Sequence, residues 1–261
     1  MLTIKEKYAF KVLSRRYLKI FMNVLIGLLA FSIVRSAFML LFWVNTDEPF
    51  SFGGFFTGLF IQDYFSVLMF VLFILTFLNY RDFKYFMQNS LSRNTYWKAK
   101  TLVILVFGFC LEVLDLGFTE ISRLLGITSY DLVNVFQNFY MTGVKSKVLL
   151  QLGSFGFSLL ILWGFCFIGF TIGGLFSMLA RKKQLVLIAV FVIIGLQALL
   201  LLLGFLLDYD GRVQDFILLF LGYSEKGSWD STLLLSFSVC SILVNMLLSH
   251  YFITKIQVKR R

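Results

Sequence analysis

The side chains best suited to chemistry are acids inside a long apolar stretch. Glu112, Asp115 and Glu120 lie in residues 101–121, at a spacing that places them on one face of a helix. An acid at the centre of a membrane helix costs about 2.5–3.5 kcal/mol on insertion scales. We therefore expect these carboxylates to face protein, water or a counter-ion.

Two interpretations of this acidic face remain open. It could line a translocation cavity that attracts a cationic or amphipathic cargo, or it could form internal ion pairs with Arg35 or Arg123. We favour ion pairing for Asp115 and Glu120 and leave both interpretations open for Glu112. The candidate cavity residues are Asp63, Glu112, Asp115 and Arg35.

The sequence contains little that resembles a catalytic or metal site. His250 is the only histidine, and no acid or cysteine pattern accompanies it. The three cysteines fall inside apolar stretches without metal-ligand spacing. No G-x-x-x-x-G-K-[ST] sequence is present, so the chain has no P-loop for ATP. We expect a protein that is not an enzyme and binds no cofactor itself.

The composition predicts an all-α polytopic membrane protein. Hydrophobic residues make up 59% of the chain and the mean hydropathy is +0.86. A soluble domain is usually about 45–50% apolar, so lipid must solvate much of this surface. A span needs about 20 apolar residues. We expect six transmembrane helices, near 19–43, 53–79, 101–121, 148–179, 184–207 and 232–254.

The distribution of positive charge predicts the orientation. The net charge is +10, and most Lys and Arg lie in residues 1–19, 80–100, 181–183 and 255–261. Positive residues concentrate on the cytoplasmic side of membrane proteins, so both termini are predicted to be cytoplasmic. This pattern explains the charge without nucleic acid, which we do not expect as a partner.

Three further features complete the expected single transmembrane domain of residues 1–261. Residues 1–18 alternate basic and apolar faces at the helical period, which predicts an interfacial amphipathic helix. Residues 208–231 contain an apolar segment too short to span, which predicts an outer re-entrant hairpin between the fifth and sixth spans. Gly169 and Gly173 form a G-x-x-x-G step that favours close helix packing.

Residues 80–100 form the most prominent basic interruption between two spans. Phe83, Phe86 and Met87 make an apolar patch at helical spacing, and the turn residues Asn89-Ser90 follow. Ser92 is placed to cap the next helix. We expect a cytoplasmic elbow: a short helix across the membrane face, a turn, and re-entry. Such a helix suits a groove on a soluble partner, although a plain basic loop that only fixes topology is the alternative.

The sequence FMQNSLSRNTYWKAK within this elbow resembles the first cytoplasmic loop of type-2 ABC exporter permeases. That loop commonly has an aromatic residue, Gln/Asn-Asn-Gly, a hydrophobic residue and Ser-Arg-x-Thr before a basic helix start. Ser90 departs from the pattern, because glycine is usual there. The matching residues are Phe86, Gln88, Asn89, Leu91, Ser92, Arg93, Thr95 and Lys100.

The resemblance is strongest to small peptide- or drug-exporting permeases of Gram-positive bacteria, and it implies a mechanism. Two permease subunits, a second copy or a paralogue, would pair in the bacterial cytoplasmic membrane. Each would dock a separate ATP-binding subunit that holds ATP and Mg. The residues implied in docking are Phe83, Phe86, Met87, Asn89, Ser92 and Arg93.

Two other functions remain open at this stage. The chain could be a non-transporting immunity or sensor protein, which would need no ATP-binding partner. It could also be an ion-coupled carrier, which would require Glu112, although the two matching halves common in such carriers are not evident.

Overall fold

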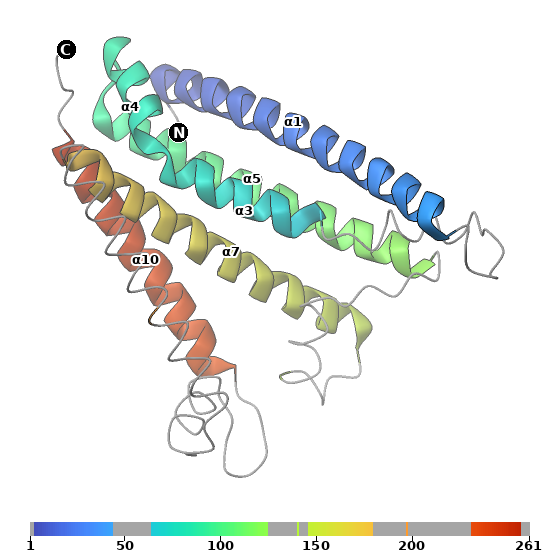
Figure 1. The fold of residues 1–261 in the computed structure, drawn as a ribbon. Helices are drawn as coiled ribbons and strands as arrows, with labels where there is room; N and C mark the ends of the chain where they lie inside the picture. The colour runs from blue at the N-terminus through green and yellow to red at the C-terminus, as the bar shows by residue number, and fades with distance from the viewer. Residues whose placement is uncertain are drawn as a thin grey trace. The chain divides into compact units, whose positions relative to one another are not determined.

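The computed structural model describes residues 3–43, 64–124, 140, 146–179, 197 and 231–256. These residues form α-helices, with no strand among them (Figure 1). The chain divides into two compact units, Met1–Asn134 and Val135–Arg261. The prediction of an all-helical protein is confirmed for this described part.

The first unit contains helices α1 (Ile4–Trp43), α3 (Tyr64–Phe77), α4 (Asn79–Gln88) and α5 (Arg93–Leu124). α1 packs along α5, where the rings of Tyr17 and Phe21 lie 5.8 and 5.6 Å from that of Phe107. α1 also contacts α3, because the Tyr64 hydroxyl donates a 2.7 Å hydrogen bond to the Ser32 hydroxyl. These contacts make α1 an integral part of the unit.

The beginning of α1 differs from the prediction of a separate interfacial helix over residues 1–18. Residues 4–43 form one helix, because no Pro or Gly interrupts the sequence between its basic and apolar parts (Figure 1). The predicted apolar stripe is real, but Leu13 and Tyr17 are buried inside the unit. Protein, not lipid, therefore covers this stripe.

A capping box starts α1 and ties it to α5. The Thr3 backbone N–H donates to Glu6 Oε2 at 2.8 Å, and the Glu6 N–H donates to the Thr3 hydroxyl at 3.3 Å. The other Glu6 oxygen pairs with Lys98 Nζ of α5 at 3.1 Å. One carboxylate thus satisfies the helix start and anchors it to a neighbour.

The second unit contains α7 (Lys147–Met178) and α10 (Thr232–Lys255), which pack against each other. The Thr171 hydroxyl donates a 2.9 Å hydrogen bond to the Asn245 carbonyl of α10. A Cβ on Gly174 would lie 3.2 Å from Cβ of Phe252, so a small residue permits this close approach.

The described helices identify a multi-pass membrane protein. Four are long and apolar enough to span: Ile4–Val34, Arg93–Ile121, Val148–Met178 and Thr232–Lys255. The bent pair α3–α4 would make a fifth. The expected spans at 148–179 and 232–254 match α7 and α10 closely. The expected span at 184–207 and hairpin at 208–231 lie outside the described residues, so six spans remain a prediction.

Candidate functional site: the elbow between two membrane helices

The elbow begins at a sharp break between α3 and α4. The two helices meet at 51°, and Leu78 between them has φ −77° and ψ 66°. The break contains neither Pro nor Gly, the usual causes of a kink. It falls where the uniformly apolar sequence of α3 changes to the amphipathic sequence of α4. If α4 continued straight from α3, its charged residues would extend the apolar span instead of lying across its end.

A carbonyl in the last turn of α3 receives side chains from two other helices. The Tyr17 hydroxyl of α1 and Lys100 Nζ of α5 each donate a 3.0 Å hydrogen bond to the Leu75 carbonyl. Carbonyls in the last turn of a helix lack intrahelical partners, and a nearby cation also complements the helix dipole. These two bonds stabilise the break and hold it between α1 and α5.

An ion cluster holds α4 from the same two sides. Asp82 of α4 is 4% exposed and pairs with Arg16 of α1. Its second oxygen lies 4.0 Å from Nζ of Lys100, which is fully buried. A buried charge needs such compensation because leaving it unpaired costs several kcal/mol. Asp82 therefore joins α1, α4 and α5 at one point.

The turn after α4 is a Schellman motif with serine in the left-handed position. Ser90 has φ 55°, a conformation that usually favours glycine. The Ser90 N–H donates to the Met87 carbonyl at 3.2 Å, and the Leu91 N–H donates to the Phe86 carbonyl at 3.1 Å. The resemblance places glycine at this position, and the structure shows the conformation that glycine would accommodate without strain.

Ser92 caps α5 as predicted. Its hydroxyl accepts a 3.1 Å hydrogen bond from the Thr95 N–H, and its carbonyl accepts one of 3.1 Å from the Tyr96 N–H. The turn chemistry and the cap together fix the re-entry of the chain into α5.

The predicted docking patch is largely inside the unit. Phe83 and Phe86 are 0% and 1% exposed, and each ring lies 5.7 Å from that of Tyr96. Their helical spacing therefore marks the face of α4 that packs on α5. In this conformation neither ring is accessible to a partner.

The exposed surface of the elbow lies at its tip and along the outer side of α4. Asn89, Ser92 and Arg93, which were predicted for docking, are exposed, and Met87 is half-buried. Tyr85 is 46% exposed. The surface that a partner could contact is thus polar and basic at the turn rather than aromatic.

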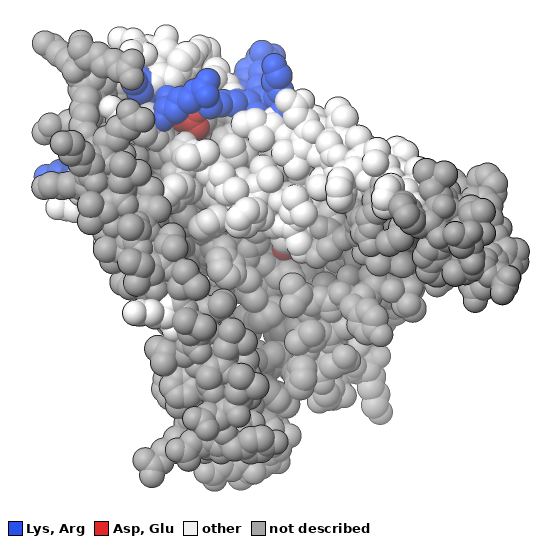
Figure 2. Space-filling model, viewed as in Figure 1, with Lys and Arg blue, Asp and Glu red and all other residues white. Residues whose placement is uncertain are grey.

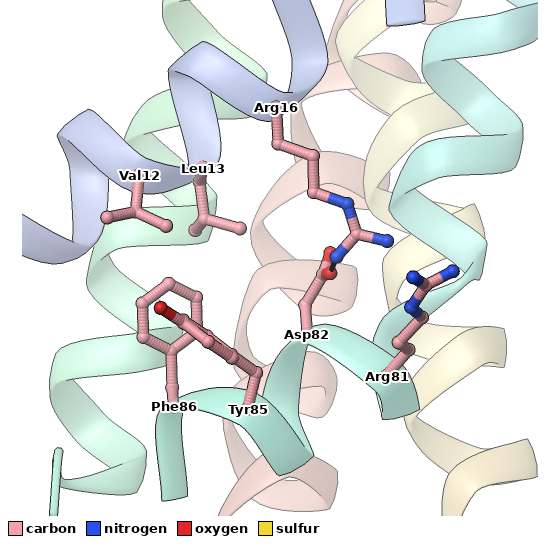
Figure 3. Close-up of a pocket in the computed structure, with 7 residues that line it drawn as sticks. All are labelled: Val12, Leu13, Arg16, Arg81, Asp82, Tyr85 and Phe86. Atoms are coloured by element: carbon pink, nitrogen blue, oxygen red, sulfur yellow. Dashed lines mark ion pairs between the residues drawn. The ribbon is translucent and has the colours of Figure 1, made fainter. Parts of the chain in front are cut away.

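A pocket of about 280 Å³ lies between the start of α1 and α4 (Figure 3). No sequence pattern predicts this pocket, since its walls come from segments about 70 residues apart. Arg16 reaches from α1 to Asp82, Arg81 extends from α4 on one side of Asp82, and the apolar side chains of the lining lie on the other side (Figure 3). Its lining residues are Val12, Leu13, Arg16, Arg81, Asp82, Tyr85 and Phe86.

The candidate cavity residues are only partly described. Glu112 is 4% exposed, and Asp115 is half-buried on the same helix. Arg35 belongs to α1, but its side chain lies outside the described part, as does Asp63 altogether. A translocation cavity at these residues remains a prediction.

The predicted packing glycines lie in α7. Gly169 and Gly173 are buried, but the described contacts with α10 are at Gly164 and Gly174. Among the described residues, no three His, Cys, Asp or Glu side chains gather as a metal site would require.

The fold and the elbow define the class as a helical multi-pass membrane protein with a bent surface helix clamped between two long helices. Comparison with family models, curated proteins and solved structures finds no match.

Proposed function

We propose that this chain is the membrane-spanning permease subunit of an ATP-driven exporter that moves a peptide or other amphipathic substrate out of the cell. A separate ATP-binding subunit supplies the energy and holds ATP and Mg, and a second permease copy or paralogue completes the membrane part. The proposal includes six spans, an outer re-entrant hairpin and cytoplasmic termini in a bacterial plasma membrane.

The observation that carries the proposal is the elbow itself. A short amphipathic helix bends away from an apolar span, turns through a rigid Schellman motif and re-enters a second long helix through a serine cap. These elements lie on the residues whose sequence resembles the first cytoplasmic loop of type-2 ABC permeases. A protruding, rigidly anchored tip suits docking of a soluble subunit.

The anchoring of the elbow supports a role in transmitting force. Asp82 and the Leu75 carbonyl connect the bend to α1 and α5 at once. A force applied to the tip would therefore act on two long helices. An ATP-driven exporter requires this coupling from the element that docks its ATP-binding subunit.

The docking surface we assign is the exposed tip, with Asn89, Ser92 and Arg93 in contact and Met87 at its edge. Phe83 and Phe86 hold the tip in place from inside. The sharpest test reverses the charge at Arg93, because α5 begins there and a glutamate suits the first turn of a helix.

The test reconstitutes the chain with its ATP-binding subunit and measures export and co-purification. We expect Arg93→Glu to abolish both at normal protein abundance, while Lys7→Glu, an exposed charge reversal in α1, leaves both intact. Normal export by Arg93→Glu would refute docking at the tip. An ATP-binding subunit that cannot hydrolyse ATP should stop export. If cells with this inactive subunit keep their protection against a toxic peptide, the result would instead indicate an immunity protein.

A further inference from the structure

The basic pocket between α1 and α4 lies at the border of a long apolar surface. Lys and Arg side chains gather where α4 lies beside the start of α1, on the face shown in Figure 2. Farther along α1, large apolar side chains are exposed, including Met22, Ile26 and Leu29. In a membrane protein this border is the level of lipid headgroups.

The charges of the pocket favour an anion. The lining contains two guanidinium groups, of Arg16 and Arg81, and one carboxylate, of Asp82, so it carries a net positive charge even without the nearby buried Lys100. Arg16 pairs with Asp82 but keeps 38% of its side chain exposed. Within the described residues Arg81 forms no ion pair, so its guanidinium is available to a ligand.

The remaining lining fits the non-charged parts of a headgroup. Leu13 and Phe86 are buried apolar residues of the lining, and Val12 is half-buried beside them. The Tyr85 side chain also belongs to the lining. The volume of about 280 Å³ is near the lower limit of small-molecule sites, about 300 Å³, which is room for a headgroup but not for acyl chains.

We propose that this pocket binds the phosphate headgroup of an anionic phospholipid, held chiefly by the Arg81 and Arg16 guanidinium groups. Arginine binds phosphate through parallel N–H···O bonds, and basic pockets between membrane helices on the cytoplasmic side take anionic headgroups. The lipid would join α1 and α4 from outside, beside the Arg16–Asp82 pair. The proposal rests on membrane residence and on the proposed cytoplasmic position of the elbow, and not on the exporter function.

The test measures lipid retention by native mass spectrometry of the full chain, with phosphatidylglycerol and phosphatidylcholine as probes. We expect one phosphatidylglycerol to be retained selectively and to raise the unfolding temperature. Arg81→Gln should weaken this retention about tenfold, in line with loss of a charged hydrogen bond. Lys84→Gln makes the same charge change on α4 outside the pocket and should have little effect.

Three results would overturn the proposal. Equal weakening by Lys84→Gln would show that overall charge, and not the pocket, attracts the lipid. Equal retention of phosphatidylcholine would remove the role of net anionic charge. Displacement of the lipid by an equal concentration of glycerol phosphate would assign the pocket to a soluble phosphate.

If Arg81→Gln fails to fold, Arg81→Lys keeps the charge, loses the forked donor and should give intermediate retention.

Discussion

Replacement of Asp82 by asparagine should be the most destabilising single change in the ion cluster. Asparagine keeps the shape of the side chain but removes the charge that Lys100 faces in a fully buried position. Removing one partner of a buried pair costs about 3–5 kcal/mol. We therefore expect Asp82→Asn to lower the free energy of unfolding by about this amount.

The partners of Asp82 should matter less. Arg16→Gln should cost about 1 kcal/mol, since Arg16 is partly exposed and Asp82 keeps Lys100 nearby. Lys100→Met should cost about 1–2 kcal/mol, because Asp82 keeps Arg16 and the Leu75 carbonyl keeps the Tyr17 hydroxyl. The expected loss of stability in the three variants thus follows from which charged group each substitution leaves without a partner.

The decisive measurement is the double variant Asp82→Asn with Lys100→Met. It removes the buried cation together with its partner, and neutral replacements of buried pairs are often tolerated. Unfolding in mixed micelles should show the double variant at least about 1 kcal/mol more stable than Asp82→Asn alone. Glu6→Gln, at a pair whose Lys98 is half exposed, is the control and should cost less. Additive losses in the double variant would refute the idea that Asp82 compensates Lys100.

Three further predictions concern other parts of the chain. Ser90→Gly should raise the free energy of unfolding by about 0.5–1 kcal/mol, because glycine accepts φ 55° without strain; a decrease would contradict the Schellman assignment. Gly174→Ala should be about 1 kcal/mol less stable than Gly156→Ala, since only the former crowds Phe252; equal melting of the two variants would contradict close packing there. If ATP drives export, the Glu112→Gln variant should still export, and its export should not depend on a proton gradient. If a proton gradient is the energy source and Glu112→Gln abolishes export, the result would favour an ion-coupled carrier.

The sequence predicts two of the described helices, α7 and α10, closely because lipid imposes a simple rule. An apolar stretch that spans a bilayer must satisfy its own backbone, so length and hydropathy locate α7 and α10 within a residue or two. Local chemistry likewise located the Ser92 cap, which depends only on residues three apart.

The apolar spacing alone does not show which face of a surface helix packs inward. The spacing of Phe83 and Phe86 correctly predicts an apolar face, but such a face suits a partner protein and the chain's own α5 equally. The signal that points inward is Asp82, the single acid of the basic stretch 80–100. Asp82 precedes Phe86 by four residues and therefore lies on the same side of α4. A single acid among so many basic residues indicates an internal ion pair.

The continuity of α1 was unpredictable for a similar reason. Basic residues at the helical period indicate an interface when the helix stands alone. Here Arg16 and Tyr17 of that segment bind Asp82 and the Leu75 carbonyl of other helices. Those partners lie some 60 residues away in the sequence, and only the fold brings them together.

The two anchors of the elbow act on different parts of the bend, and this has a mechanical consequence. Tyr17 and Lys100 hold the end of α3 through its backbone, while Arg16 and Lys100 hold α4 through Asp82. Lys100 takes part in both, and it lies seven residues beyond Arg93, where the helix that Ser92 caps begins. Rotation of α4 about the break at Leu78 would therefore strain both anchors at once. The motion of the tip that breaks the fewest contacts is one in which α4 moves together with α5 and the start of α1. A force applied at the turn would therefore displace the long helices and would not simply bend the chain at Leu78.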